Sequence, residues 1–145
     1  MPGIFYLFDH KGKIVRWNKN FETVSRYSKK QLKSMTLVDF FKGDDIQTIA
    51  MNVEKVFKEG WASVEANFVT KDDKSIPYLF TGTLVHLDGE AYLAGIGIDI
   101  AKRKKAEENL KNAYKKLEKQ SALLVQTEKM SALGLMAAGI AHELN

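Results

Sequence analysis

The spacing of apolar residues changes near residue 100, and this change divides the chain into two parts. Before that point, short apolar or alternating runs bounded by Gly, Asp, Asn and Lys predict β-strands. Asp88-Gly89 joins the last two of these strands and is the strongest two-residue hairpin signal in the chain. The predicted strands cover residues 3–9, 14–18, 62–68, 75–87 and 90–100.

Helical spacing occupies the stretch between the second and third predicted strands. Ser28 can cap a short helix over residues 29–34, and residues 37–41 form a compact apolar turn. The best short helix is predicted over residues 44–59, with Asp44 as its N-cap and Gly60 as the left-handed residue at its end. Ile46, Ile49, Val53, Val56 and Phe57 form its apolar stripe.

This order, with helices inserted between the second and third of five antiparallel strands, resembles that of PAS domains. The motif residues agree with the topology over residues 3–103. The family's opening hairpin is similar to Gly3-Ile-Phe-Tyr-Leu-Phe-Asp9 and Gly12-Lys-Ile-Val-Arg-Trp-Asn18. Its first helices are similar to Phe21, Tyr27-Ser28 and Gln31-Leu32, and its exit is similar to Gly95-Ile-Gly-Ile-Asp99-Ile100 with Arg103. The resemblance implies an α+β fold with a five-stranded antiparallel sheet.

Three positions depart from the family pattern. Arg26 replaces a usual glycine, Asp73 or Lys74 replaces another, and Ala101 replaces a threonine in the exit motif. Asp99 and Arg103 can still form a pair at this junction, where the resemblance places signal transfer.

Residues 101–145 contain no proline and only two glycines, so they predict one long helix. At about 1.5 Å per residue it extends on the order of 65–70 Å. Helices in proteins gain most of their stability from packing, so we expect this one to need a partner. Leu110, Leu117 and Leu124 recur every seven residues, as in a parallel dimeric coiled coil. Polar Gln120 and Thr127 weaken the alternate positions of this seam.

Beyond Leu124 the apolar residues keep a helical spacing, but in a heptad register displaced by one residue. Leu123 can occupy a seam position of this displaced register. Either the apolar face widens because a four-helix bundle begins near Met130, or the seam is bistable and can rotate or slide. The predicted seam consists of Leu110, Leu117, Leu123, Leu124, Met130, Leu133 and Ile140.

Residues 127–145 resemble the phosphoacceptor helix of sensor histidine kinases, a run of small and apolar residues that ends in His142-Glu143-Leu144-Asn145. In either register His142 faces outward, and an outward imidazole is an available nucleophile. The resemblance implies that His142 accepts phosphate and that Glu143 is its base. The alternative is a solvated His-Glu pair on a surface helix.

Composition narrows the function further. The 145 residues are 45% hydrophobic and 28% charged, as in a folded soluble domain, and we expect a cytoplasmic protein without a membrane segment. With no cysteine, disulfides, thiolate metal sites and flavin-cysteine photochemistry are excluded, and no metal site is expected. The net charge of +4 does not predict nucleic-acid binding.

A small apolar pocket between helices and sheet is expected in the first part. Its candidate lining residues are equally those of an ordinary packed core, and the pocket could be empty. We expect His86 to be a surface histidine rather than an axial haem ligand. The candidates are Trp17, Asn18, Phe40, Phe41, Ile49, Val53, Phe57, Phe68, Phe80, His86, Tyr92 and Ile96. On the other face of the sheet, Phe5, Leu7, Val85 and Leu93 are expected to need a cover, most simply a second subunit.

Three parts are therefore predicted: a PAS sensor over residues 1–100, a coiled-coil linker over 101–126, and a truncated phosphoacceptor helix over 127–145. The resemblance implies a homodimer that receives phosphate from ATP and Mg²⁺ on the parent's ATP-binding domain and passes it to a response regulator. This stretch carries no ATP-binding motif and should be inactive alone. The rival interpretation is a non-enzymatic PAS dimerisation and signalling module.

Overall fold

The computed structural model describes the backbone of residues 3–144 and the side chains of residues 3–134. The chain divides into two compact units, Met1–Lys102 and Arg103–Asn145, and each is described by itself. The first contains β1 (Ile4–Asp9), β2 (Ile14–Trp17), α1 (Lys19–Ser25), α2 (Lys29–Leu32), the 3₁₀ helix η1 (Leu37–Phe40), α3 (Asp44–Glu59), β3 (Trp61–Val69), β4 (Ser75–Leu87) and β5 (Glu90–Asp99).

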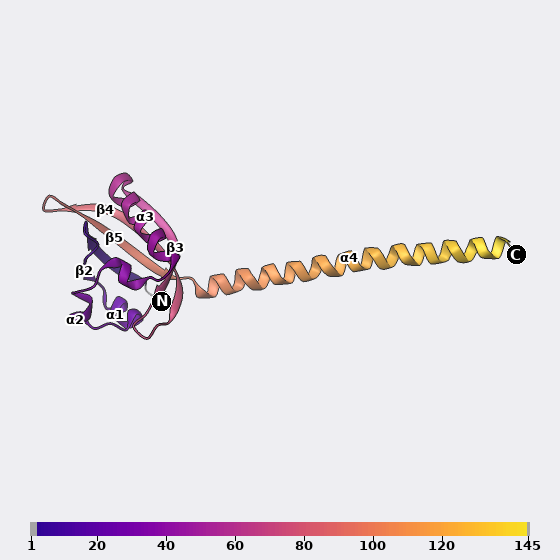
Figure 1. The fold of residues 1–145 in the computed structure, drawn as a ribbon, viewed down its shortest axis with the longest axis horizontal. Helices are drawn as coiled ribbons and strands as arrows, with labels where there is room; N and C mark the ends of the chain where they lie inside the picture. The colour runs from indigo at the N-terminus through magenta and orange to yellow at the C-terminus, as the bar shows by residue number, and fades with distance from the viewer. Residues whose placement is uncertain (1–2, 145) are drawn as a thin grey trace. The chain divides into compact units, whose positions relative to one another are not determined.

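All neighbouring strands are antiparallel, in the order β2-β1-β5-β4-β3, so β5 is the central strand of the sheet. The helices cover one face, which we call the inner face, and α3 lies along it (Figure 1). The predicted five-stranded antiparallel fold with helices inserted after the second strand is confirmed.

Local turn chemistry follows the sequence closely. Asp88 and Gly89 have φ values of 51° and 80°, and Leu87 pairs with Glu90, which defines a two-residue hairpin whose central residues are both left-handed. At α2, the Ser28 hydroxyl accepts a hydrogen bond from the Gln31 backbone N–H, while the Gln31 side chain accepts one from the Ser28 N–H. The predicted cap at Ser28 is confirmed as a reciprocal capping box.

The predicted cap at Asp44 is wrong by one residue. Gly43 is the N-cap of α3, with φ 60°, and Asp44 is the first helical residue. Only glycine adopts that backbone conformation without cost, so the glycine takes the cap position. Asp45 instead uses its carboxylate to accept the backbone N–H of Asn67 at 3.0 Å, which ties α3 to β3. Gly60 ends the helix with φ 95°, as predicted.

Two departures from the family pattern fall on left-handed backbone. Arg26 has φ 68° at the end of α1, and Asp73 has φ 66° in the β3–β4 turn. Glycine is usual at such positions because it has no Cβ to clash in this conformation. Here Asp73 forms an ion pair with Lys42, whereas Arg26 lies exposed at its turn.

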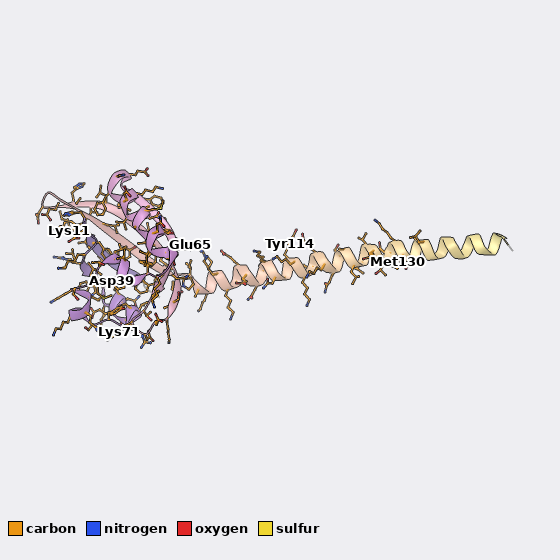
Figure 2. All side chains as sticks on the ribbon, viewed as in Figure 1. Lys11, Asp39, Glu65, Lys71, Tyr114 and Met130 are labelled. Carbon is orange, nitrogen blue, oxygen red and sulfur yellow. The ribbon has the colours of Figure 1, made fainter. Side chains whose placement is uncertain are left out.

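The second unit is α4 (Ala101–Leu144), one unbroken helix. Its described side chains, residues 101–134, are all exposed, including Leu110 at 73%. Figure 2 shows Tyr114 and Met130 projecting from it without a covering element. Within the described residues, no helix combines the length and apolar content that crossing a bilayer requires.

Candidate functional site

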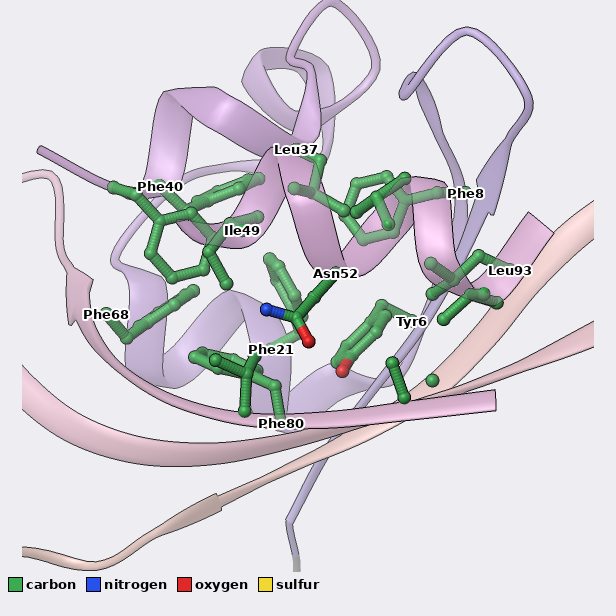
Figure 3. Close-up of a pocket in the computed structure, with 16 residues that line it drawn as sticks. Tyr6, Phe8, Phe21, Leu37, Phe40, Ile49, Asn52, Phe68, Phe80 and Leu93 are labelled. Carbon is green, nitrogen blue, oxygen red and sulfur yellow. The ribbon is translucent and has the colours of Figure 1, made fainter. Parts of the chain in front are cut away.

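The inner face of the sheet and α3 enclose a cavity of about 50 Å³. Figure 3 shows it surrounded by aromatic rings from β1, α1, η1, β3 and β4. The lining residues are Tyr6, Phe8, Phe21, Leu37, Phe40, Phe41, Ile49, Asn52, Val53, Val56, Ala62, Val64, Phe68, Phe80, Gly82 and Leu93.

The rings pack tightly around this space. Phe40 stacks on Phe68 with ring centroids 5.6 Å apart, and Phe21 meets both edge-on at 5.2 and 5.7 Å. Phe41 meets Phe80 edge-on at 5.3 Å. Offset stacks and edge-to-face contacts of this kind are the favourable ring geometries, so the wall is a packed core.

Two polar groups reach the cavity. The Tyr6 hydroxyl donates towards the backbone carbonyls of Thr81, at 3.2 Å, and Ile96, at 3.3 Å, and burial raises the pKa of this phenol above its usual range. Asn52 projects from α3 among the rings, and its Nδ2 donates to the Thr48 carbonyl at 2.8 Å. Its Oδ1 accepts no hydrogen bond from the described part of the chain. Asn52 therefore offers the cavity a carboxamide oxygen that can accept a hydrogen bond.

Six of the predicted pocket residues line the cavity: Phe40, Phe41, Ile49, Val53, Phe68 and Phe80. Phe57 and Trp17 are half-buried at the edge of the core, and the Trp17 indole N–H donates to Glu22 at 3.1 Å. Asn18 has a structural role: its carboxamide oxygen accepts from the N–H of Phe5 and Phe21, and its amide donates to the Gly3 carbonyl.

Three predicted positions lie elsewhere. Tyr92 and Ile96 are on the outer face of β5, and His86 is exposed near the hairpin. The predicted inward face of β5 is wrong, because both faces of this strand are apolar and its sequence does not distinguish them. The inward face of β5 is the one that carries Gly95 and Gly97, because these two positions have no room for a side chain. A Cβ at Gly97 would lie 2.8 Å from Ile4, and one at Gly95 would overlap the Tyr6 ring.

For the same reason Leu93, predicted on the outer face, is buried in the inner core. Leu7 is on the outer face, as predicted, but is buried there, whereas Phe5 is 42% exposed. Sequence reasoning also missed the lining residues Tyr6, Phe8, Phe21 and Asn52. The two-residue period of a strand puts Ile4, Tyr6 and Phe8 on one face of β1. This period could have predicted that Tyr6 and Phe8 line the same cavity.

At the junction, the Asp99 carboxylate accepts the Ala101 backbone N–H at 2.8 Å and so caps the first turn of α4. Arg103 lies 3.6 Å from Glu107 within α4. The Asp99–Arg103 pair would link the two units and stays a prediction.

The predicted phosphoacceptor lies at the far end of α4. The backbone of α4 is helical through His142 and Glu143, but their side chains, and that of Ile140, lie outside the described residues. The other predicted seam residues, Leu110 to Leu133, are exposed on α4. Among described side chains, no group of three or more histidines and carboxylates could hold a metal ion.

Comparisons with known proteins distinguish the two units. A family model described as PAS domain matches residues 2–102. The sensor histidine kinase TmoS of Ectopseudomonas mendocina is 24% identical over 143 residues; the match covers 96% of this chain but only 14% of TmoS.

Solved structures match the fold of the first unit. A PAS domain from Colwellia psychrerythraea has a TM-score of 0.62 at 23% identity, covering 69% of this chain and 87% of its own. The PAS domain of the quorum-sensing receptor RpfR from Cronobacter turicensis, solved in complex with C12:0, has a TM-score of 0.59 at 22% identity, covering 69% and 95%.

Proposed function

The chain belongs to the PAS domain family, and we propose that it is the sensor and phosphoacceptor part of a two-component sensor histidine kinase. One observation carries the proposal: the similarity to TmoS continues past residue 102 and covers 96% of the chain, which includes α4 as well as the PAS domain. The unbroken backbone of α4 is consistent with it, because a single helix joins the sensor to the residues that resemble a phosphoacceptor motif.

In this proposal the neutral imidazole of His142 attacks the γ-phosphoryl group of ATP. One ring nitrogen forms the new N–P bond, the bond to the ADP oxygen breaks, and Glu143 accepts the proton of the other ring nitrogen. A separate ATP-binding domain of the parent supplies the nucleotide and Mg²⁺. The phosphoryl group then passes to an aspartate of a response regulator. Such transfer depends mainly on positioning, so a change in helix orientation is sufficient for control.

Two copies of α4 would form the parallel dimer that presents these histidines. Leu110, Leu117 and Leu124 lie in one heptad register, and Met130 and Leu133 in the displaced one. A sensor that favours one register over the other would rotate the helix end that carries His142. Leu123→Ala and Leu124→Ala should therefore lock or uncouple signalling in the parent kinase, with Lys115→Ala as the control.

Phosphate acceptance tests the proposal directly. The chain is incubated with radiolabelled ATP and the ATP-binding domain of a histidine kinase, and acid-labile label is measured. We expect His142→Gln to abolish labelling, whereas His10→Gln and His86→Gln, which change the two other histidines of the chain, retain it. Equal labelling of the wild type and His142→Gln would favour a non-enzymatic PAS signalling module, an alternative consistent with a family match that ends at residue 102.

The sensor half would respond through its core cavity. The volume of about 50 Å³ is a third of the roughly 150 Å³ that holds benzene in an engineered cavity, so the closed core admits only a water-sized or gas-sized molecule beside Asn52. A chain such as the C12:0 bound by RpfR would enter only if the core opened. Native mass spectrometry and an absorption spectrum of the purified chain should show no retained acyl chain or chromophore; either one would refute a closed core.

A further inference from the structure

The charges of the PAS unit are unevenly distributed along the chain. Residues 9–33, which span the β1–β2 turn, β2, α1 and α2, carry eight lysines and arginines but two carboxylates, a net charge of +6. Residues 34–100 carry five lysines and eleven carboxylates, a net charge of −6. We call these the basic region and the acidic region. The unit is neutral as a whole but presents a strongly positive region.

The cations of the basic region have no acidic partners in the described part of the chain. None of the eight forms an ion pair with a described carboxylate. The two local carboxylates are engaged by uncharged donors, since Asp9 accepts two backbone N–H groups of its own turn and Glu22 accepts the Trp17 indole N–H. In the acidic region, by contrast, ion pairs hold three of the five lysines, Lys42, Lys58 and Lys74.

Part of the basic region forms a groove where β2, α1 and α2 meet (Figure 1). Two apolar side chains line it, Val15, which is exposed, and Trp17, which is half-buried. The cations that line it are all exposed. We call this the basic groove, and its lining residues are Val15, Arg16, Trp17, Lys19, Glu22 and Lys29. Tryptophan and arginine are among the residues that contribute most binding energy in protein interfaces.

We propose that the basic groove binds an acidic segment of a partner protein. Carboxylates of the segment pair with Arg16, Lys19 and Lys29, and an apolar side chain between them covers Trp17 and Val15. This contact goes beyond the proposed phosphoryl transfer and does not depend on it.

The chemistry of the groove favours a protein segment over other anions. The planar guanidinium of Arg16 can bind a carboxylate through two hydrogen bonds. The apolar lining gives an apolar side chain a surface to cover, which a simple anion could not use. A long polyanion or a charged membrane surface that extended across the unit would also meet the acidic region and be repelled there. A short segment meets the basic groove alone.

Peptide binding to the full chain tests the proposal. A fluorescein-labelled, glutamate-rich peptide with a central phenylalanine is titrated with the protein at low salt, and its anisotropy is measured. Two matched peptides have glutamine in place of every glutamate, or glycine in place of the phenylalanine. We expect each to bind at least tenfold more weakly, because one lacks the charges and the other lacks the apolar contact. Equal affinity of all three peptides would refute the proposal.

Charge reversal locates the site on the protein. Arg16→Glu combined with Lys29→Glu should weaken binding of the peptide at least tenfold. The control combines Lys55→Glu on α3 with Lys105→Glu on α4, changes the net charge equally, and should weaken binding less than about twofold. All four side chains are exposed, so neither pair should disturb the core. Equal weakening by both pairs would show that the peptide responds only to overall charge, and would refute the groove.

Competition experiments identify the class of partner. Phosphatidylserine vesicles and a single-stranded oligonucleotide are added to the complex of the chain with the labelled peptide. We expect neither to displace the peptide at an equal concentration of negative charge. Displacement by either would make a membrane or a nucleic acid the occupant and overturn the proposal. Failure of the peptide to bind would also overturn it, and would leave phosphate acceptance at His142 as a separate question.

Discussion

The PAS unit packs an apolar core within itself, whereas α4 buries none of its described apolar side chains. Phe21, Phe40 and Phe68 are almost completely buried in the first unit. On α4, Leu110 is 73% exposed and Leu117 is 64% exposed. The two units have comparable apolar side chains but different topology, because a sheet with helices on one face encloses a volume and a single helix does not.

This difference shows where each unit obtains its stability. The PAS unit carries its own core and should fold regardless of concentration. A single exposed helix of this length gains too little from its backbone hydrogen bonds alone, so α4 should depend on a partner. Phe5, Ile96 and Ile98 are intermediate, since they belong to the self-sufficient unit but remain exposed.

The largest expected effect tests the self-sufficient core. Phe68→Ala removes a ring that packs against Phe21, Phe40, Tyr78 and Phe80, and should cost about 3–5 kcal/mol in the free energy of unfolding. Urea denaturation followed by tryptophan fluorescence should give this loss at every protein concentration. The control Trp61→Ala, at a 55% exposed side chain of the same strand, should change stability by less than about 0.5 kcal/mol. A similar loss in both variants would contradict the assigned core.

The next effect tests the dependent helix. Leu117→Ala should weaken the proposed dimer at least tenfold, about 1.4 kcal/mol, because it would remove an apolar side chain from the seam of both copies. Sedimentation equilibrium measures the dissociation constant. Lys115→Ala, on the outward side of the same turn, should leave it unchanged. A wild-type chain that stays monomeric with a fully helical α4 would break the comparison, because the helix would then need no partner.

A pH titration of stability tests whether the phenols of Tyr6 and Tyr78 are buried in the core. Burial raises the pKa of Tyr6 above its usual range and that of Tyr78 to about 12, with Asp99 adding to the second shift. Between pH 10 and 12 these phenols keep their protons when folded but lose them when unfolded, so stability falls as pH rises, by up to about 1.4 kcal/mol per pH unit for each group.

Urea denaturation of the wild type, Tyr6→Phe and Tyr78→Phe from pH 9 to 12 measures this slope. Each substitution should make the slope shallower, because it removes one phenol that ionises at a higher pH in the folded state. An unchanged slope in Tyr6→Phe would show that its phenol ionises equally in the folded and unfolded states.

The smallest effect concerns backbone conformation. Arg26 has φ 68°, where a side chain is unfavourable and glycine is tolerated. Arg26→Gly should therefore raise the free energy of unfolding by about 0.5–1 kcal/mol, after the entropy cost of glycine is subtracted. Arg26→Ala is the control and should not stabilise. Destabilisation by glycine would indicate that the arginine side chain makes a compensating interaction.

Most of the fold could be predicted because its signals are local. Asp88-Gly89 has the backbone freedom that a tight hairpin needs, Ser28 has a hydroxyl at the right distance from the Gln31 N–H, and Gly60 follows an apolar helical stripe. The Asp44 cap was misplaced because the aspartate and the glycine before it are both good cap residues. Six of the predicted pocket residues line the cavity, and two of these, Ile49 and Val53, belong to the apolar stripe of α3 that the sequence already shows.

The sequence by itself determined the helices and strands, their order and the apolar face of each helix, since these depend on residues only a few positions apart. Only the tertiary structure decided which face of β5 points inward. Leu93 and Ile96 are equally apolar, and the choice between them depends on Ile4 and Tyr6, which lie about ninety residues earlier and need Gly97 and Gly95 opposite them. Strands that are far apart in the sequence come into contact only in the folded chain. The residues of β5 alone therefore could not predict which of its faces points inward.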